Sequence, residues 1–259
     1  MKGWYNNTLD DVVAGSLSAA KADIDWMVRN RMAASDRDVN YTSLYMTRSL
    51  YSNPNFLETM KYAAGKNILF GAAYSDKTKV DSVLAHNASK SYPAQQFKFM
   101  VTEYEPYQTG MSYSYLTDLM TYAYPKLRAA GLKHVVYMGW PVETYWQTIV
   151  DNCDEINLHI YRNDVQMTES AMWSYATANN RLGAIAAAAK RRGVKMKVNP
   201  IYSCEPEFAD QWFKSRPWWE AQRVFMRAWD RWATKDMGTW LTATDGYMFV
   251  TKEGKKVKP

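Results

Sequence analysis

Two glutamates separated by one residue are the side chains in this sequence best suited to acid catalysis. Glu103 and Glu105 close the segment Phe97–Glu105, whose other alternate residues, Phe97, Phe99 and Val101, are apolar. Residues two apart on a strand share a face, so all five are expected to point the same way. Like charges in a partly desolvated site raise one pKa and keep that group protonated. The spacing fits an acid-catalytic pair, or two exposed carboxylates of which one pairs with a nearby Lys or Arg.

A second polar series lies in the segment Glu155–Tyr161, where Asn157, His159 and Tyr161 alternate with Ile156, Leu158 and Ile160. Either set can face the interior of a barrel. The side of a barrel strand that meets the helices is normally apolar, which favours the polar set facing inward. Three inward polar groups then need one another or a ligand as partners. His159 by itself is equally suited to a structural role.

Further candidates for ligand binding lie where other strands are expected to end. They are aromatic residues and one carboxylate: Trp4, Tyr5, Tyr45, Tyr74, Trp140, Tyr202 and Glu205. Aromatic residues make up 15% of the chain, and they can either fill a core or line a groove for sugars. The rings at helical spacing in Pro206–Trp232, which include Trp212, Trp219 and Trp229, are expected to pack in the core. Asp245, before Gly246, suits a turn better than a site.

The elements that must position these residues alternate along the chain. Eight segments have the pattern of strands: Lys2–Asn6, Val39–Met46, Asn67–Tyr74, Phe97–Glu105, His134–Trp140, Glu155–Tyr161, Val194–Tyr202 and Thr239–Val250. Helical stretches separate them. One helix is expected to begin at Thr8 and another at Ser75 and Asp76, which can cap its first turn, and the segment Ala184–Arg192 has the strongest helix propensity. Gly65, Gly131 and Gly193 are expected to end helices in the left-handed conformation.

This alternation predicts an α/β fold, a compact (β/α)8 TIM barrel with few insertions that uses residues 1–259 as a single domain. Catalytic residues of such barrels lie at the carboxyl ends of the strands, where the glutamate pair is expected. An open doubly wound sheet is the alternative, but no glycine-rich phosphate loop follows a strand.

Composition excludes several classes of protein. With 47% hydrophobic and 22% charged residues the chain is globular, and no apolar run is long enough to span a membrane. No signal peptide is recognisable at Met1–Asn7. The three histidines lie on different elements, so no metal site and no cofactor are expected. Cys153 and Cys204 are expected at opposite ends of the barrel, too far apart for a disulfide.

The order of the strands resembles glycoside hydrolase family 18, the chitinase-like barrels, over nearly the whole chain. Four segments carry the likeness: Gly3–Asn7, Lys66–Ala73, Asp154–Tyr161 and Asn199–Ser203. The family's fourth strand ends in Asp-x-Asp-x-Glu, where this chain has Val101, Glu103 and Glu105. Arg162 stands where the family has an aspartate after its acetamide-positioning tyrosine, which is Tyr161 here.

The resemblance implies a substrate-assisted, retaining mechanism, which is an exception to the scheme with two catalytic carboxylates. Glu105 would protonate the glycosidic oxygen, and the substrate's own N-acetyl oxygen would attack the anomeric carbon. Glu103 would steady the positively charged intermediate, and Tyr161 would hold the acetamide.

Two hypotheses about function follow. The first is a glycoside hydrolase acting on N-acetylhexosamine glycans such as chitin, peptidoglycan or N-glycans. The second, which the departures at Val101 and Arg162 motivate, is a catalytically impaired glycan-binding or structural barrel. A nucleic-acid partner is not expected, because the net charge is only +6 and the basic tail Lys252–Lys258 suits a solvated segment. A glycan partner indicates a secreted, periplasmic or cell-surface protein; the oligomeric state is left open.

Overall fold

A computed structural model describes residues 2–6, 15–29, 39–43, 48–107, 110–160, 169–203, 229, 240–242 and 247–250. For β1, β2 and β9 it gives the course of the backbone only. The predicted helix Pro206–Trp232, apart from Trp229, and the tail Lys252–Lys258 lie outside the described residues. No helix in the part of the chain so described is long and apolar enough to cross a membrane.

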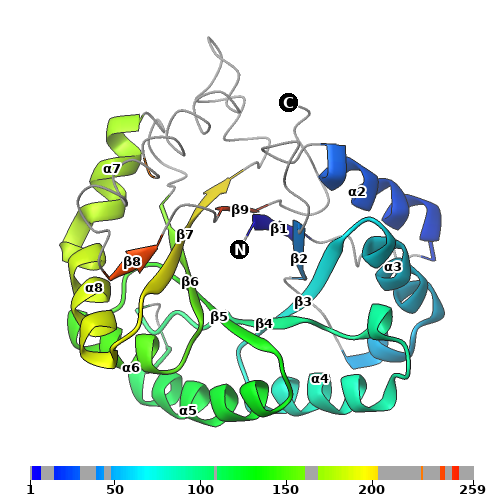
Figure 1. Cartoon of the computed structure of the whole chain (residues 1–259), viewed down its shortest axis with the longest axis horizontal. Coiled ribbons are helices and arrows are strands. Elements are labelled where there is room, and N and C mark those ends of the chain that lie inside the picture. Colours follow the sequence, from blue (N-terminus) through cyan, green and yellow to red (C-terminus); the bar gives the residue numbers. More distant parts are fainter. Residues whose placement is uncertain are drawn as a thin grey trace.

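The fold is α/β, with parallel strands and helices alternating along the chain (Figure 1). The strands are β1 (Lys2–Asn6), β2 (Val39–Ser43), β3 (Ile68–Tyr74), β4 (Phe99–Thr102), β5 (Lys133–Met138), β6 (Glu155–His159), β7 (Met196–Ser203), β8 (Leu241–Thr242) and β9 (Tyr247–Val250). The helices are α2 (Leu17–Arg29), α3 (Pro54–Gly65), α4 (Lys77–Ser89), α5 (Tyr113–Ala129), α6 (Trp146–Asp151), α7 (Glu169–Thr177) and α8 (Arg181–Arg192). Short 3₁₀ turns occupy Arg48–Ser52, Pro93–Gln95, Glu143–Tyr145 and Ala178–Asn180.

The strands form one sheet in the order β6-β5-β4-β3-β2-β1-β9-β7-β8, and β6 also pairs with β7. Every pairing is parallel. Each of the eight segments expected to be strands overlaps one, and the last contains two, β8 and β9. Figure 1 shows the helices around the outside of the strands, so the sheet has an outer face toward the helices and an inner face away from them.

Alternation along each strand divides the side chains between these two faces. Ile156 and Leu158 of β6 belong to the large core between sheet and helices, together with Val136 of β5. The inner face holds a smaller apolar cluster of Phe99, Val101, Val135 and Ile201. Because the outer core is one continuous apolar cluster, it fixes which residues of each strand remain for the inner face.

Local sequence explains where several helices begin and end. The Asp76 side chain accepts a hydrogen bond from the Lys79 amide at 2.8 Å, which caps the start of α4 as predicted. Gly131 and Gly193 have φ of 71° and 73°, the left-handed conformation expected after α5 and α8. The expectation for Gly65 is wrong, because the positive φ of 60° after α3 is at Asn67.

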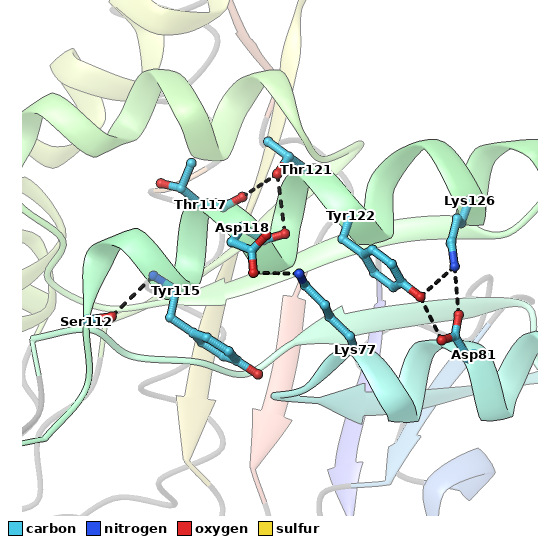
Figure 2. A network of polar contacts seen from close by, with 9 residues as sticks. All are labelled: Lys77, Asp81, Ser112, Tyr115, Thr117, Asp118, Thr121, Tyr122 and Lys126. Carbon is cyan, nitrogen blue, oxygen red and sulfur yellow. Dashed lines mark hydrogen bonds and ion pairs between the residues drawn. The ribbon is translucent and has the colours of Figure 1, made fainter.

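Helices α4 and α5 lie side by side and are joined by polar contacts on their exposed surface (Figure 2). Lys77 reaches Asp118 at 2.5 Å, while Lys126 and the Tyr122 hydroxyl both contact Asp81, at 2.9 and 2.6 Å. Exposed ion pairs contribute about 1 kcal/mol or less, so the apolar core contributes most of the stability of this packing. The contacts nevertheless hold α4 against α5. The first turn of α4 contains Lys79, which lies near the glutamate pair.

Candidate active site

The glutamate pair follows β4 directly. The Glu103 amide donates to the Tyr74 carbonyl at 2.8 Å, so strand-like pairing continues one residue beyond Thr102. Phe99 and Val101 occupy the inner face, and the same alternation places Glu103 there. The expectation for Phe97 is wrong: this residue precedes β4 and packs in the outer core beside Phe56, with ring centroids 6.0 Å apart.

The environment of Glu103 makes it a proton carrier near neutral pH. Burial raises its pKa to about 7, and the negative charge of Glu105 adds to the rise. Lys79 opposes the shift, because its positive charge favours the ionised carboxylate. The Glu103 carboxyl is therefore partly protonated at pH 7, the range in which a general acid works best.

Tyr107 contacts the second glutamate. Its hydroxyl donates a hydrogen bond to Oε1 of Glu105. A Cβ built on Gly139 would lie 2.5 Å from the Tyr107 hydroxyl oxygen and 3.5 Å from Nδ1 of His159. Gly139, which follows β5, therefore lies between the phenol that contacts Glu105 and the imidazole that ends β6.

Strand β6 turns its polar residues inward, as the sequence favoured. Asn157 is fully buried, and its Oδ1 accepts from Nδ2 of Asn199 at 2.9 Å. His159 packs against Tyr137, with near-parallel rings whose centroids are 6.0 Å apart. The hydrogen bond with Asn199 provides a partner for the Asn157 amide, which would otherwise be costly to bury.

The inner polar series continues down to an ionised carboxylate at the start of β6. Glu155 accepts from Nζ of Lys133 at 2.5 Å and from Nδ2 of Asn199 at 3.0 Å. Burial by itself would raise the pKa of Glu155, but positive charges that include Lys133 and Lys197 hold it at about 2. The Glu155 carboxylate is therefore ionised at neutral pH, whereas the Glu103 carboxyl titrates near neutrality.

Trp140, expected to bind sugar, is held by a buried arginine. The guanidinium carbon of Arg181 lies 3.8 Å from the centroid of the Trp140 ring, and the indole N–H donates to the Tyr175 hydroxyl at 3.1 Å. Arg181 also donates to the carbonyls of Gly139 at 2.8 Å and His159 at 2.9 Å. Burial lowers the pKa of Arg181 to about 10, so the group remains cationic at neutral pH.

Tyr74 does not lie where the sequence analysis placed it. It is 1% exposed and belongs to the outer core, with its hydroxyl 2.7 Å from Nε2 of His134 and 2.8 Å from Oγ1 of Thr102. Burial raises the pKa of its phenol. Ile68, Phe70 and Ala72 lie on the same face of β3 as Tyr74, because they are two residues apart along the strand. Since these three are apolar, the period of two predicts that Tyr74 faces the helices.

For the remaining candidate site residues the structure gives no side-chain positions. Tyr161, Tyr45, Glu205, Arg162, Cys204 and Asp245 lie outside the described residues, and for Trp4, Tyr5 and Tyr202 only the backbone is described. Among the residues whose positions are described, no group of three or more His, Cys, Asp and Glu side chains is arranged to hold a metal ion. Cys153 is a buried free thiol.

Two residues of the site were missed in the sequence. Tyr107 continues the period-two series of Glu103 and Glu105, so extending that series would have found it. Arg181 gave no such signal, because a basic residue before an Ala-rich helix normally faces solvent. Only the packing of α8 against the ends of β5 and β6 makes it a buried contact of Trp140.

No protein-family model and no curated protein sequence matches the chain. Solved structures give distant similarity. One is of the pneumococcal virulence factor StrH, described by its N-glycan recognition and hydrolysis, at 11% identity and TM-score 0.49 over 100% of this chain and 79% of that one. A Bacteroidetes-affiliated GH5 cellulase matches at 11% identity and TM-score 0.38 over 89% of this chain and 74% of that one.

A third structure, of the bifunctional proline utilization A protein, matches at 11% identity and TM-score 0.42 over 96% of this chain. The chain spans 25% of the length of that protein. Similarities at this level identify no activity, so the function is inferred below from the side chains themselves.

Proposed function

We propose that the protein is a glycoside hydrolase acting on glycans that contain N-acetylhexosamine, by substrate-assisted retaining hydrolysis. The observation that carries the proposal is the pair Glu103 and Glu105, of which Glu103 has a pKa raised to about 7 by burial and by its neighbour's charge. The mechanism needs one proton donor and one negative carboxylate beside the reacting sugar, and a pair that holds a single proton near pH 7 supplies both.

The scaffold proposed for this site is a (β/α)8 barrel formed by residues 1–259 as one domain. In its support, the strand pairings run from β1 through β2, β3, β4, β5 and β6 to β7, and from β7 through β9 back to β1. A barrel places the ends of β4, β5 and β6 around one opening, where its catalytic side chains belong.

In the proposed reaction Glu105 protonates the glycosidic oxygen while the substrate's acetamide oxygen attacks the anomeric carbon, so the glycosidic bond breaks and the alcohol leaves. Water then attacks the anomeric carbon of the cyclic intermediate and gives a proton back to Glu105. Glu103 steadies the cationic intermediate, and Tyr161 holds the acetamide. Closely coupled carboxyl groups titrate as a pair, so the proton carried near neutral pH is available to either residue. His159 ends β6 and Trp140 follows β5, and in the proposed site they supply a hydrogen bond and an aromatic surface for the sugar, while Asn157, fully buried and paired with Asn199, lies beneath them.

The proposal is tested by hydrolysis of N-acetylglucosamine-linked oligosaccharides. We expect wild type to turn over at least one of them, and Glu105→Gln to lower kcat/KM by about 100-fold or more, since general acid catalysis contributes at least this much. Glu58→Gln is the control, because Glu58 is an exposed carboxylate on α3 that pairs with Lys61. Equal turnover by wild type and Glu105→Gln, or none by wild type across a broad panel of glycans, would reject a hydrolase.

A second candidate function is glycan binding without catalysis. Val101, which stands at the position of a family aspartate, is fully buried in the inner apolar cluster with Phe99 and Val135, so β4 supplies an apolar side chain and not a carboxylate two residues before Glu103. Binding to a glycan array that persists in Glu105→Gln, with no hydrolysis by either protein, would favour this function. Absence of binding to any glycan would count against both candidates.

A further inference from the structure

We propose that Tyr107 is a positioning residue for Glu105, and that Gly139 is a glycine because the Tyr107 phenol occupies the space of its missing side chain. The catalytic role of Glu105 in this inference rests on the proposed function, whereas the contacts of Tyr107 and Gly139 are those of described residues. Neither Tyr107 nor Gly139 has a role in the resemblance on which the roles of Glu105, Glu103 and Tyr161 were assigned.

The first contact is between Tyr107 and Glu105. The phenol O–H donates to Oε1 of Glu105. Pro106, buried between them, restricts the backbone of this short segment, because its ring fixes φ. A donor held this way can set the orientation of the carboxylate as well as its charge, since a hydrogen bond to the ionised form stabilises that form.

The second contact is between Tyr107 and Gly139. A Cβ at Gly139 would lie 2.5 Å from the phenol oxygen and 3.1 Å from Cζ, closer than side chains normally approach. The Gly139 carbonyl is held by Arg181 at 2.8 Å, so the backbone cannot easily withdraw. An alanine at this position would therefore have to displace the phenol, and with it the hydrogen bond to Glu105.

The charged and titratable groups around Glu103 and Glu105 determine how the hydrogen bond from Tyr107 affects the protonation of the pair. Glu103 lies on the same segment, and Lys79 approaches it from α4. His159 approaches Gly139 from β6. By favouring the ionised form of Glu105, Tyr107 leaves the proton of the resting pair with Glu103, and it holds Glu105 in one orientation before a substrate arrives. In the proposed reaction this proton passes from Glu103 to Glu105 before Glu105 protonates the glycosidic oxygen.

The deciding measurement is a titration of isotope-labelled glutamate side-chain carboxyls by NMR, which requires no enzymatic activity. In Tyr107→Phe we expect the lower titration midpoint of the coupled pair to rise by about one pH unit, the effect of losing one charge-assisted hydrogen bond. Tyr104→Phe is the matched control. This variant removes the hydroxyl of the residue between the two glutamates. That hydroxyl accepts a hydrogen bond from the Ser112 amide at 2.9 Å and contacts neither carboxylate in the structure. An unchanged midpoint in Tyr107→Phe, or an equal shift in both variants, overturns the inference.

The contact with Gly139 is tested by a double-mutant cycle on the free energy of unfolding in urea. We expect Gly139→Ala to destabilise wild type more than it destabilises Tyr107→Phe, because the phenol oxygen is the atom in closest conflict with the new Cβ. Equal losses in the two backgrounds overturn the assignment of Gly139. If Gly139→Ala fails to fold in either background, the carboxyl titration of Tyr107→Phe still decides the role of Tyr107.

Activity separates this inference from the proposed function. If wild type hydrolyses a glycan, the acidic limb of the kcat/KM profile should move in Tyr107→Phe by the same amount as the titration midpoint. A titration shift without hydrolysis by wild type would reject the hydrolase and retain the positioning role. Hydrolysis by wild type with unshifted carboxyls would retain the hydrolase and reject the positioning role.

Discussion

Glu103 and Glu105 share one strand end but differ in environment. Glu103 is partly buried and has Lys79 as its nearby positive charge, whereas Glu105 accepts a hydrogen bond from Tyr107. Burial disfavours the ionised form of Glu103, and the hydrogen bond favours that of Glu105. The difference between two residues of the same type therefore comes from the neighbours that the fold supplies.

This difference predicts how activity depends on pH. The glutamate pair holds one proton below the pKa of about 7 of Glu103 and loses it above that pH, and the proposed reaction needs this proton on Glu105, so kcat/KM of the proposed hydrolase should fall as the pH rises through about 7. Lys79→Met removes a positive charge that favours ionisation, so the falling limb should move to higher pH. Lys61→Met, an exposed lysine on α3, is the control and should leave it in place. A limb that moves to lower pH in Lys79→Met, or a profile that is flat through neutrality, would contradict this account of Glu103.

At the scale of elements, short loops and helix ends bring the site together. Arg181 begins α8, yet its guanidinium contacts the carbonyls that end β5 and β6 and stacks on Trp140. One buried cation thus fixes three elements in the region where Gly139 meets Tyr107. The ends of the helices depend on the backbone conformation of single residues, and single substitutions can measure its contribution to stability.

Two glycines at helix ends provide a matched comparison. Gly193 follows α8 with φ of 73°, whereas Gly65 ends α3 without a positive φ, and an added Cβ would meet nothing within 4 Å at either position. We expect Gly193→Ala to destabilise the protein by about 1–2 kcal/mol, the cost of a left-handed L-residue. Gly65→Ala should be neutral or stabilise it by up to about 1 kcal/mol, because alanine restricts the unfolded chain. Chemical denaturation measures both, and equal effects would show that the conformation at Gly193 is not what requires glycine.

At the scale of the whole molecule, the sheet separates two polar networks. On the outer face, His134 links β5 to the Tyr74 and Thr102 hydroxyls and to the Asn152 carbonyl. On the inner face, Asn157, Asn199 and Glu155 form the polar series below the glutamate pair. The outer network is fully buried in the core that holds the helices, so its protonation bears on global stability.

His134 therefore predicts a pH dependence of unfolding. Burial lowers its pKa to about 4 in the folded protein, against the ordinary value of 6.5. Between these values the unfolded chain binds a proton that the folded protein does not, so stability rises with pH across this window and is fully present above it. The difference amounts to about 3 kcal/mol at most.

The measurement is the free energy of unfolding in urea from pH 4 to pH 7, for wild type and for His134→Gln. Their difference should grow with pH up to about 6.5 and then level off, since other titrating groups cancel. Parallel curves would contradict the assignment. If His134→Gln does not fold, NMR titration of the wild-type imidazole gives the same answer, because protonation near pH 6.5 in the folded state excludes the predicted shift.

The sequence by itself determined the alternation of strands and helices, the position of the glutamate pair after β4, and the inward polar residues of β6. These features depend on periods of two and 3.6 residues, on caps and on the apolar requirement of a helix-covered face, all of which are local. Trp229, expected to pack, is buried against Trp173 with ring centroids 5.8 Å apart. The resemblance to one glycosidase family added roles for Glu105, Glu103 and Tyr161, which stay predictions.

Only the tertiary structure decided that Tyr74 lies under the helices, that Arg181 is buried at the ends of β5 and β6, and that Tyr107 meets Gly139. These contacts join residues far apart in the chain or depend on which face of a strand the core covers, and no local period encodes them. The spacing of the pair already predicted one raised pKa, but only the tertiary structure decided that Glu103 is the residue concerned, because its burial and the approach of Lys79 depend on how the end of β4 and α4 are packed.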